Sequence, residues 1–118
     1  MKTVYIASPY TKGDTAINVK RQLDCAAQLM DLGFCPIVPL LTHFQHIHKP
    51  RTYNDWLKID FEKLRRCDVV LRLHGESKGA DAEVQHALTL GIPVVYSVSG
   101  LLRRSEDIVE RMFADEKD

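Results

Sequence analysis

Residues 69–98 read VVLRLHGESKGADAEVQHALTLGIPVVYSV and divide into three parts. Residues 69–73 are a short apolar run rich in β-branched side chains, which predicts a buried strand. Residues 79–90 carry apolar side chains at helical spacing, and Gly91 is a residue that commonly ends a helix. Residues 92–98 again have the composition of a strand. This order predicts a βαβ unit, whose two strands lie parallel.

The first third of the chain repeats this alternation. Residues 4–7 (VYIA) predict a strand that Ser8 and Pro9 close, a helix then runs to a stop at Gly33, and residues 34–39 predict a second strand. The expected apolar stripe of that helix is Val19, Leu23, Ala26, Ala27 and Met30. We therefore expect an α/β fold over residues 1–118 as one domain: a small doubly wound, flavodoxin- or Rossmann-like parallel sheet of four to five strands flanked by helices.

The remaining segments connect these units. Residues 40–51 lack periodicity and are predicted as a long loop, while residues 52–55 resemble a capping box that opens a helix to about Arg66. A final helix is predicted over residues 105–114. In such folds ligands bind beyond the carboxyl ends of the strands. The loops to search are therefore residues 8–14, 40–51 and 74–79.

Composition narrows the function classes. Among 118 residues, 16 Lys and Arg balance 16 Asp and Glu without a basic block, which argues against a nucleic-acid polymer as partner. No apolar run approaches the roughly 20 residues of a membrane helix, and the start leads directly into a strand, so we expect neither membrane association nor a signal peptide. Cys25, Cys35 and Cys67 are widely spaced and odd in number, which predicts buried thiols in a reducing compartment. These features predict a cytoplasmic protein that acts on small molecules or protein partners.

Two acidic residues occupy positions where apolar residues are expected. Asp60 lies four residues from both Trp56 and Leu64, and Glu83 lies in the apolar stripe of the helix over residues 79–90. A buried carboxylate must be hydrogen-bonded, protonated or at the mouth of a pocket. Such a pair indicates an acid/base or nucleophile/acid function. Alternatively, each is a cap or half of a buried ion pair with one of three arginines: Arg65, Arg66 and Arg72.

The loop over residues 75–79 leads from a strand into a helix. It brings the Ser77 hydroxyl and free backbone N–H groups together, which favours an anion such as a phosphate, although the spacing is not that of a P-loop. Alternatively, Ser77 caps the helix and Gly79 makes the turn. The segment Thr11-Lys12-Gly13 has the same two interpretations, an anion-binding loop or a surface turn.

Three histidines, His43, His46 and His48, lie in the predicted loop. A zinc cluster needs a fourth ligand of evident spacing, which the loop lacks, so we expect no metal and favour single histidines that line a pocket or are solvated. Asp68 at the start of a strand indicates a carboxylate that fixes a loop. Trp56 and Phe44 could stack on a base, although core packing explains Trp56 as well.

Several of these motifs together resemble the nucleoside 2-deoxyribosyltransferase superfamily. They are Tyr5-Ile6-Ala7-Ser8-Pro9, Trp56…Asp60, Cys67-Asp68-Val69-Val70 and Ser77-Lys78-Gly79-Ala80-Asp81-Ala82-Glu83. The resemblance covers nearly the whole chain, and the serine-x-glycine-x3-glutamate element is its most specific part. Within the superfamily the chain looks most similar to the 2′-deoxynucleoside 5′-monophosphate N-glycosidases and CMP hydrolases, which carry serine at the position of Ser77. Residues 39–44, together with residues 75–81, also resemble small phage and bacterial members of unassigned function.

The resemblance implies a role for each matching residue. Glu83 is the expected nucleophile at C1′ of the sugar, Asp60 the general acid that protonates the departing base, and Tyr5 the residue that orients Glu83. Ser77 and Gly79 are expected to hold a 5′-phosphate. We expect Glu83 to stay ionised near the helix N-terminus, and crowding by apolar neighbours to raise the pKa of Asp60.

The other expected binding residues lie in the same loops. Lys12 supplies a positive charge in the first loop, where the nucleotide hydrolases carry an arginine, and Lys78 adds a second positive charge next to Ser77. Ser8, Thr11 and His43 complete the expected substrate-binding set.

The resemblance therefore implies an enzyme without a cofactor that hydrolyses or transfers the N-glycosidic bond of a nucleoside or nucleoside 5′-monophosphate. It also implies a homo-oligomer, a dimer or higher, for which Ile108, Val109 and Met112 are candidate contact residues, although core packing explains them equally well. The alternative from another class is a nucleotide-binding sensor module without turnover. A phosphoryl-accepting receiver-like domain is excluded because no acidic cluster follows the first strand.

Overall fold

Strands and helices alternate along the computed structural model, which describes residues 1–105. The elements are β1 (Thr3–Ala7), α1 (Thr15–Asp31), β2 (Cys35–Ile37), the 3₁₀ helix η1 (Pro39–Leu41), α2 (Thr42–His48), α3 (Tyr53–Leu64), β3 (Val69–Arg72), α4 (Lys78–Thr89) and β4 (Val94–Val95). A further helical segment covers residues 98–105. The predicted α/β class is confirmed.

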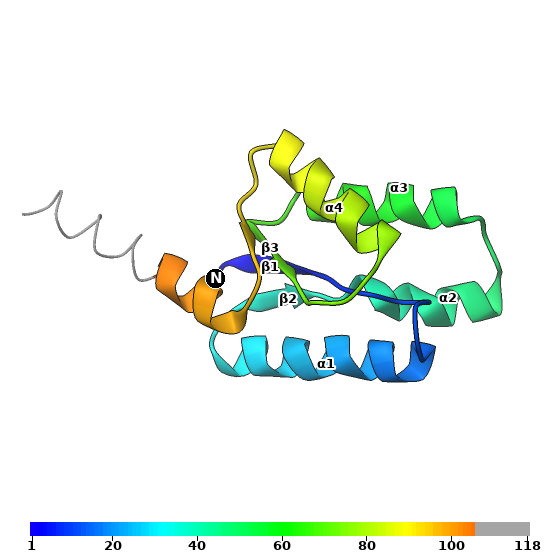
Figure 1. The fold of residues 1–118 in the computed structure, drawn as a ribbon, viewed down its shortest axis with the longest axis horizontal. Helices are drawn as coiled ribbons and strands as arrows, with labels where there is room; N and C mark the ends of the chain where they lie inside the picture. The colour runs from blue at the N-terminus through cyan, green and yellow to red at the C-terminus, as the bar shows by residue number, and fades with distance from the viewer. Residues whose placement is uncertain (106–118) are drawn as a thin grey trace, which may run out of the picture.

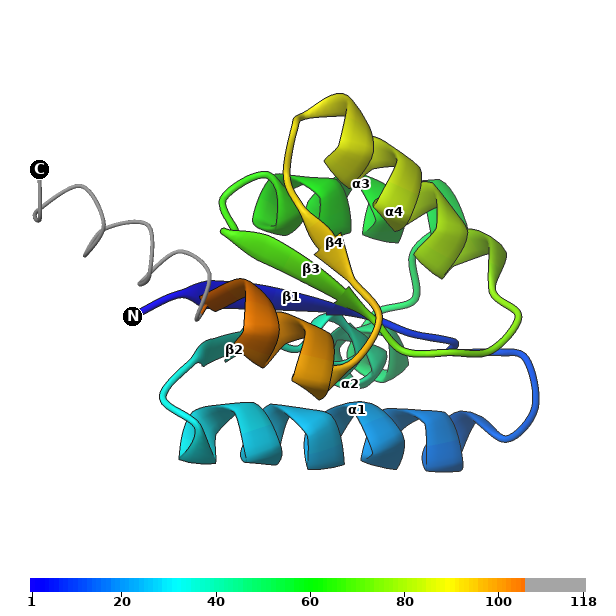
Figure 2. The ribbon, with the colours of Figure 1, turned by 60° about the vertical axis from the view of Figure 1, so that its left-hand side comes forward.

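The sheet is parallel and has the strand order β2-β1-β3-β4. Side chains alternate across it, so Val4 and Ile6 of β1 face one core cluster while Tyr5 and Ala7 face the other. Helix α1 and residues 98–105 cover the first face, and α3 and α4 cover the second (Figures 1 and 2). The chain order reverses direction between β1 and β3, where doubly wound folds bind ligands.

The predicted capping box of α3 is confirmed. The Thr52 hydroxyl accepts from the backbone N–H of Asp55 at 3.2 Å, and the Asp55 carboxylate accepts from the backbone N–H of Thr52 at 3.4 Å. Asp68 fixes a neighbouring segment as expected, because its carboxylate accepts from the backbone N–H of Thr3 at 2.8 Å. The capping box fixes where α3 begins, and the contact between Asp68 and Thr3, which are 65 positions apart, fixes how β3 enters the sheet beside β1.

The prediction of a long loop over residues 40–51 is wrong. Helix α2 occupies most of it, and the Thr42 hydroxyl donates to the Pro39 carbonyl at 2.8 Å where η1 passes into α2. None of its seven residues is buried, and Phe44 and Ile47 are exposed. The segment therefore has no buried apolar stripe, which is the signal that periodicity detects.

The predicted apolar stripe of α1 is correct only in part. Leu23, Ala27 and Met30 are exposed, whereas Gln22 is fully buried. The buried residues are Val19, Gln22, Cys25, Ala26 and Leu29. A glutamine can take a core position here because polar partners meet its amide group, which an apolar pattern does not reveal.

The predicted strand over residues 92–98 is shorter than expected. Only Val94 and Val95 pair with β3, and the Ser97 hydroxyl then accepts from the backbone N–H of Gly100 at 2.9 Å as a helix begins. The final helix predicted over residues 105–114 lies outside the described residues apart from Ser105. Its candidate contact residues Ile108, Val109 and Met112 also lie outside them.

Two further observations concern the described part of the chain. Cys25 and Cys67 are buried and Cys35 is half-buried, and all three are free thiols. Across residues 1–105, no helix combines the length and apolar character needed to cross a membrane.

Candidate active site

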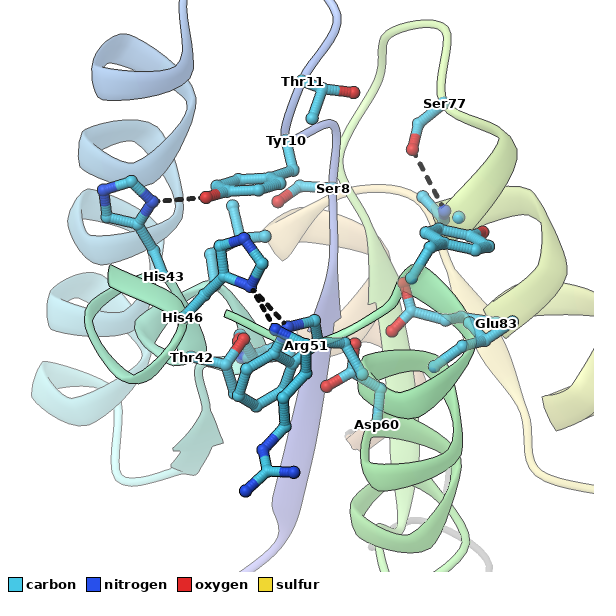
Figure 3. Close-up of a pocket in the computed structure, with 17 residues that line it drawn as sticks. Ser8, Tyr10, Thr11, Thr42, His43, His46, Arg51, Asp60, Ser77 and Glu83 are labelled. Atoms are coloured by element: carbon cyan, nitrogen blue, oxygen red, sulfur yellow. Dashed lines mark hydrogen bonds between the residues drawn. The ribbon is translucent and has the colours of Figure 1, made fainter. Parts of the chain in front are cut away.

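A cavity of about 260 Å³ opens beyond the carboxyl ends of β1 and β3 (Figure 3). Its walls come from the β1–α1 loop and from α2, α3 and α4. Seven of the residues predicted for the site line this cavity: Ser8, Thr11, His43, Asp60, Ser77, Gly79 and Glu83. The cavity therefore lies at the switch point where the strand order predicts a ligand.

Glu83 extends from the second turn of α4 and is 6% exposed. The hydroxyl of Tyr5, a fully buried residue in the middle of β1, donates a hydrogen bond to Glu83 Oε2. The alternation of β1 directs Tyr5 to the α4 face, so the sheet itself orients the carboxyl group. Tyr5 thus lies behind the cavity wall and acts on the site through Glu83.

The pKa of Glu83 is raised to about 8, mainly because burial penalises the charged form. The Tyr5 hydrogen bond and the charge of Arg72 oppose this rise, and the charge of Asp60 adds to it. The expectation that the helix dipole keeps Glu83 ionised at neutral pH is therefore wrong. Glu83 is the sixth residue of α4, beyond the first turn where the free N–H groups act.

Asp60 faces the same cavity from α3, one turn after Trp56 (Figure 3). Its Oδ1 atom is buried and has no hydrogen-bond partner within residues 1–105. Burial raises the pKa of Asp60 to about 6, with Lys63 opposing the rise, which agrees with the expected direction. A buried carboxyl oxygen without a partner is costly and is typical of a functional position.

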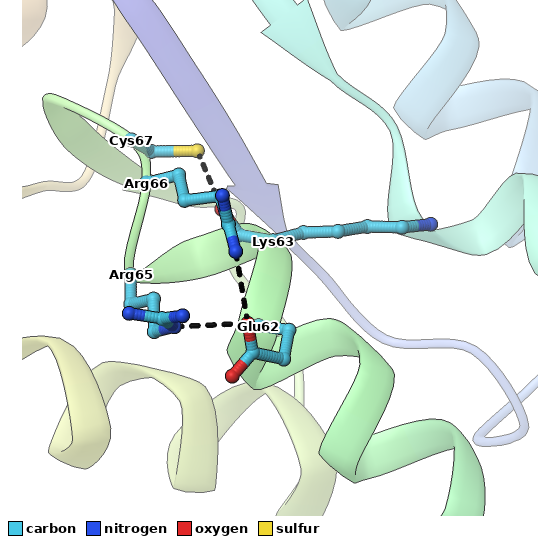
Figure 4. Close-up of polar contacts among 5 residues, drawn as sticks. All are labelled: Glu62, Lys63, Arg65, Arg66 and Cys67. Carbon is cyan, nitrogen blue, oxygen red and sulfur yellow. Dashed lines mark hydrogen bonds and ion pairs between the residues drawn. The ribbon is translucent and has the colours of Figure 1, made fainter.

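The alternative that the arginines pair with these two acids is wrong. Arg65 and Arg66 contact Glu62 at 2.9 and 3.4 Å on the exposed face of α3 (Figure 4). Arg72 contacts Asp81 at 3.0 Å. Neither cavity carboxylate forms an ion pair with these arginines.

The β3–α4 loop carries Ser77 to the cavity. Its hydroxyl accepts from the Ala80 backbone N–H at 3.0 Å, so the capping interpretation is confirmed. Buried Arg72 donates to the Gly75 carbonyl at 2.8 Å and also to the Leu73 carbonyl. Gly75 has φ +124°, and a Cβ there would lie 2.7 Å from Pro9 Cγ, so close packing of the two loops requires glycine.

The opposite wall is built by α2 and the start of α3. The Tyr10 hydroxyl and His43 Nδ1 are hydrogen-bonded, and His46 Nδ1 accepts from Trp56 Nε1 at 2.8 Å. Phe44 is 60% exposed and does not line the cavity. In the part of the chain that the structure describes, no three histidine, cysteine or acidic side chains gather as a metal site would need.

A family model described as "Domain of unknown function (DUF7768)" matches residues 2–97. The chain belongs to this family. No curated protein matches the DUF7768 chain in sequence.

Two solved structures are similar to the DUF7768 chain in fold. A 2-deoxyribosyltransferase from Bacillus psychrosaccharolyticus is 22% identical with a TM-score of 0.57, over 78% of this chain and 69% of that one. A 2-desoxiribosyltransferase from Leishmania mexicana is 18% identical with a TM-score of 0.59, over 81% of this chain and 63% of that one. The chain thus spans about two thirds of each neighbour and shares their fold.

Two predicted binding residues lie outside the cavity wall of the DUF7768 chain. Lys12 is exposed and pairs with Glu76 at 3.5 Å, which links the β1–α1 and β3–α4 loops. Lys78, the first residue of α4, is also exposed and absent from the wall. Their expected contact with an anion stays a prediction.

Sequence reasoning missed several residues of the site. Gln22 donates to the Ile6 carbonyl at 3.0 Å and to Ser8 Oγ at 2.8 Å, and accepts from the Leu40 backbone N–H at 2.9 Å. It thereby holds Ser8 at the cavity. The other missed lining residues are Tyr10, Pro39, Leu40, Thr42, Arg51, Tyr53 and Leu57. For Gln22 a signal was available in the sequence, because it is a polar residue within the apolar face of a helix. The same signal singled out Asp60 and Glu83.

Proposed function

We propose that the protein cleaves or exchanges the N-glycosidic bond of a nucleoside or nucleoside 5′-monophosphate. One observation carries the proposal: Glu83 and Asp60 face one cavity from two helices, and within residues 1–105 Glu83 accepts a hydrogen bond from Tyr5 whereas Asp60 Oδ1 has no partner. The fold supports it, because the structural neighbours are named as 2-deoxyribosyltransferases. The Ser77-to-Glu83 element supports the monophosphate N-glycosidase subgroup.

The proposed reaction has two steps. A Glu83 carboxylate oxygen forms a bond to C1′ while the C1′–N bond breaks and its electron pair goes to the base, which takes a proton from Asp60. Water then attacks C1′, its proton passes to Asp60, and the Glu83 carboxylate leaves. A second base in place of water gives transfer instead of hydrolysis.

The proton must move before this reaction starts. At neutral pH a pKa of about 8 keeps Glu83 protonated, and a pKa of about 6 leaves Asp60 ionised. The proposed chemistry needs the reverse arrangement. A bound base that accepts a hydrogen bond from Asp60 favours protonation at its unpartnered Oδ1, and positive charge developing on the sugar favours the Glu83 carboxylate.

The test is base release. The purified protein is incubated with ribo- and deoxyribonucleosides and their 5′-monophosphates, and the products are separated by liquid chromatography. We expect free base from the wild type, none from Glu83→Gln, and wild-type rates from Glu62→Gln, whose carboxylate lies on the exposed face of α3. Addition of a second base distinguishes transfer from hydrolysis. If the wild type releases no base, with or without the added second base, the proposal is contradicted.

One observation favours a second candidate, a nucleotide-binding sensor of the same fold. The raised pKa of Glu83 leaves its carboxyl group uncharged at neutral pH. If the protein is a sensor, calorimetry shows nucleotide binding without base release, and Glu83→Gln binds as tightly as the wild type.

A further inference from the structure

His46 accepts two hydrogen bonds at the same ring nitrogen. Its Nδ1 atom lies 2.8 Å from Trp56 Nε1 and 3.2 Å from the backbone nitrogen of Arg51. An indole N–H and a backbone N–H can only donate, so Nδ1 must be the acceptor of both. The neutral ring therefore carries its hydrogen on Nε2.

His46, which carries this hydrogen on Nε2, lines the cavity. Both hydrogen bonds that the structure gives the ring go to Nδ1, and the other nitrogen lies on the opposite edge of the ring, toward Tyr10 and Ser8 (Figure 3). The neutral His46 ring can thus donate into the cavity, and it cannot accept from Nε2. His43 is different, because its partner, the Tyr10 hydroxyl, can donate or accept.

The position of His46 assigns it to the base and not to the sugar. Its partner Trp56 lies one helical turn before Asp60 on α3, whereas Glu83 extends from α4. If Glu83 attacks the sugar, the base departs toward Asp60 and therefore toward His46. The edge ring contact between His46 and Trp56, with centroids 5.9 Å apart, leaves both rings on that wall.

We propose that His46 is a specificity-determining residue whose Nε2–H donates to an exocyclic carbonyl oxygen of the base, so the site selects oxo-bases over amino-bases. This inference rests on the proposed function for the identity of the ligand. A purine or pyrimidine with an amino group in place of that oxygen presents a second donor to Nε2–H. Two opposed donors leave both hydrogen-bonding groups unsatisfied in a desolvated site, which is strongly unfavourable.

The first test measures the ring itself and needs no turnover. Long-range ¹H–¹⁵N correlation spectra of the free protein at neutral pH distinguish the two nitrogens of each histidine, and His46→Gln assigns the His46 signals by their loss. We expect a protonated Nε2 and an unprotonated Nδ1. A ring protonated at Nδ1, alone or together with Nε2, overturns the proposal.

The second test compares free bases by calorimetry: hypoxanthine against adenine, and uracil against cytosine. We expect the oxo-base of the preferred ring class to bind roughly tenfold or more tightly than its amino counterpart. The His46→Gln amide can present its oxygen or its nitrogen, so the ratio should fall to near one. His48→Gln is the matched control, because His48 is exposed on the same helix and absent from the cavity wall.

The outcomes separate the two proposals. Equal binding of both members of each pair, no binding of any of the four bases, or an unchanged ratio in His46→Gln overturns the role of His46. Selective binding without base release from any nucleoside leaves His46 as a base reader and contradicts the glycosidic reaction instead.

Discussion

The carboxyl groups of Glu83 and Asp60 face one cavity from different surroundings. Glu83 is anchored by a fully buried tyrosine of the central strand, whereas Asp60 Oδ1 has no partner among residues 1–105. Burial raises both pKa values, to about 8 for Glu83 and about 6 for Asp60. The difference teaches that the core fixes the position of one carboxyl group and leaves the other available for a ligand, as a nucleophile and an acid require.

Replacement of the anchored carboxyl group should have the largest effect. Glu83→Gln keeps the shape of the side chain and removes the proposed nucleophile, so base release should fall on the order of 10³–10⁵-fold. Liquid chromatography of the released base measures this, with Glu62→Gln as control. A variant that keeps a tenth of the activity shows that Glu83 is not the nucleophile.

Replacement of the unpartnered carboxyl group should cost less and depend on the substrate. Asp60→Asn removes the general acid, and we expect a loss on the order of 10²–10³-fold with ordinary nucleosides. A 7-methylpurine nucleoside carries a cationic base that leaves without a proton. On this substrate Asp60→Asn should therefore lose less than about tenfold in activity. Glu83→Gln should lose activity equally on both substrates. Asp24→Asn on the exposed face of α1 is the control. Equal losses of Asp60→Asn on both substrates would refute the acid role.

The raised pKa of Glu83 should also make the stability of the fold depend on pH. Folding raises the pKa of Glu83 from 4.5 to about 8, so its favourable contribution is complete below about pH 4.5 and is lost as the pH rises through 8. Glu83→Gln has no ionisable group at this position, so the variant does not lose this stability as the pH rises. Its free energy of unfolding relative to wild type should therefore increase with pH, on the order of 3–5 kcal/mol between pH 4.5 and 9. Urea unfolding at both ends of this range measures it, and a pH-independent difference contradicts it.

The pH dependence of turnover should require a single proton on the pair. Below about pH 6 both groups are protonated and the nucleophile is neutral, and above about pH 8 both are ionised and no acid remains. We expect kcat/KM to peak between these values and to fall about tenfold per pH unit on each side. Asp60→Asn should lose the alkaline limb. A profile that stays flat from pH 5 to 9 is incompatible with the pair.

The smallest effect should come from the anchor. Tyr5→Phe removes the hydrogen bond that lowers the pKa of Glu83, so this pKa should rise further and kcat should fall roughly tenfold. The alkaline side of the pH profile, which the proton on Glu83 sets, moves to higher pH, and a purely structural change does not cause this shift. Tyr96→Phe, at an exposed tyrosine, is the control. An unchanged profile indicates that Tyr5 contributes packing alone.

Local sequence determined much of this protein. The alternation of apolar runs predicts the parallel sheet, residues 52–55 predict the start of α3, and two acids in apolar stripes predict a pair of special carboxyl groups. These features depend on contacts within one or two helical turns, which spacing along the chain reveals.

Long-range packing determined the rest. It brings Tyr5 to Glu83 across 78 positions, buries Gln22 against Ser8, and joins His46 to Trp56 across ten. It also reverses the expected ionisation of Glu83, because desolvation depends on every segment that covers the side chain, whereas the helix dipole depends on α4 alone. Periodicity identified the two carboxyl groups, and only the folded surroundings set which of them holds the proton.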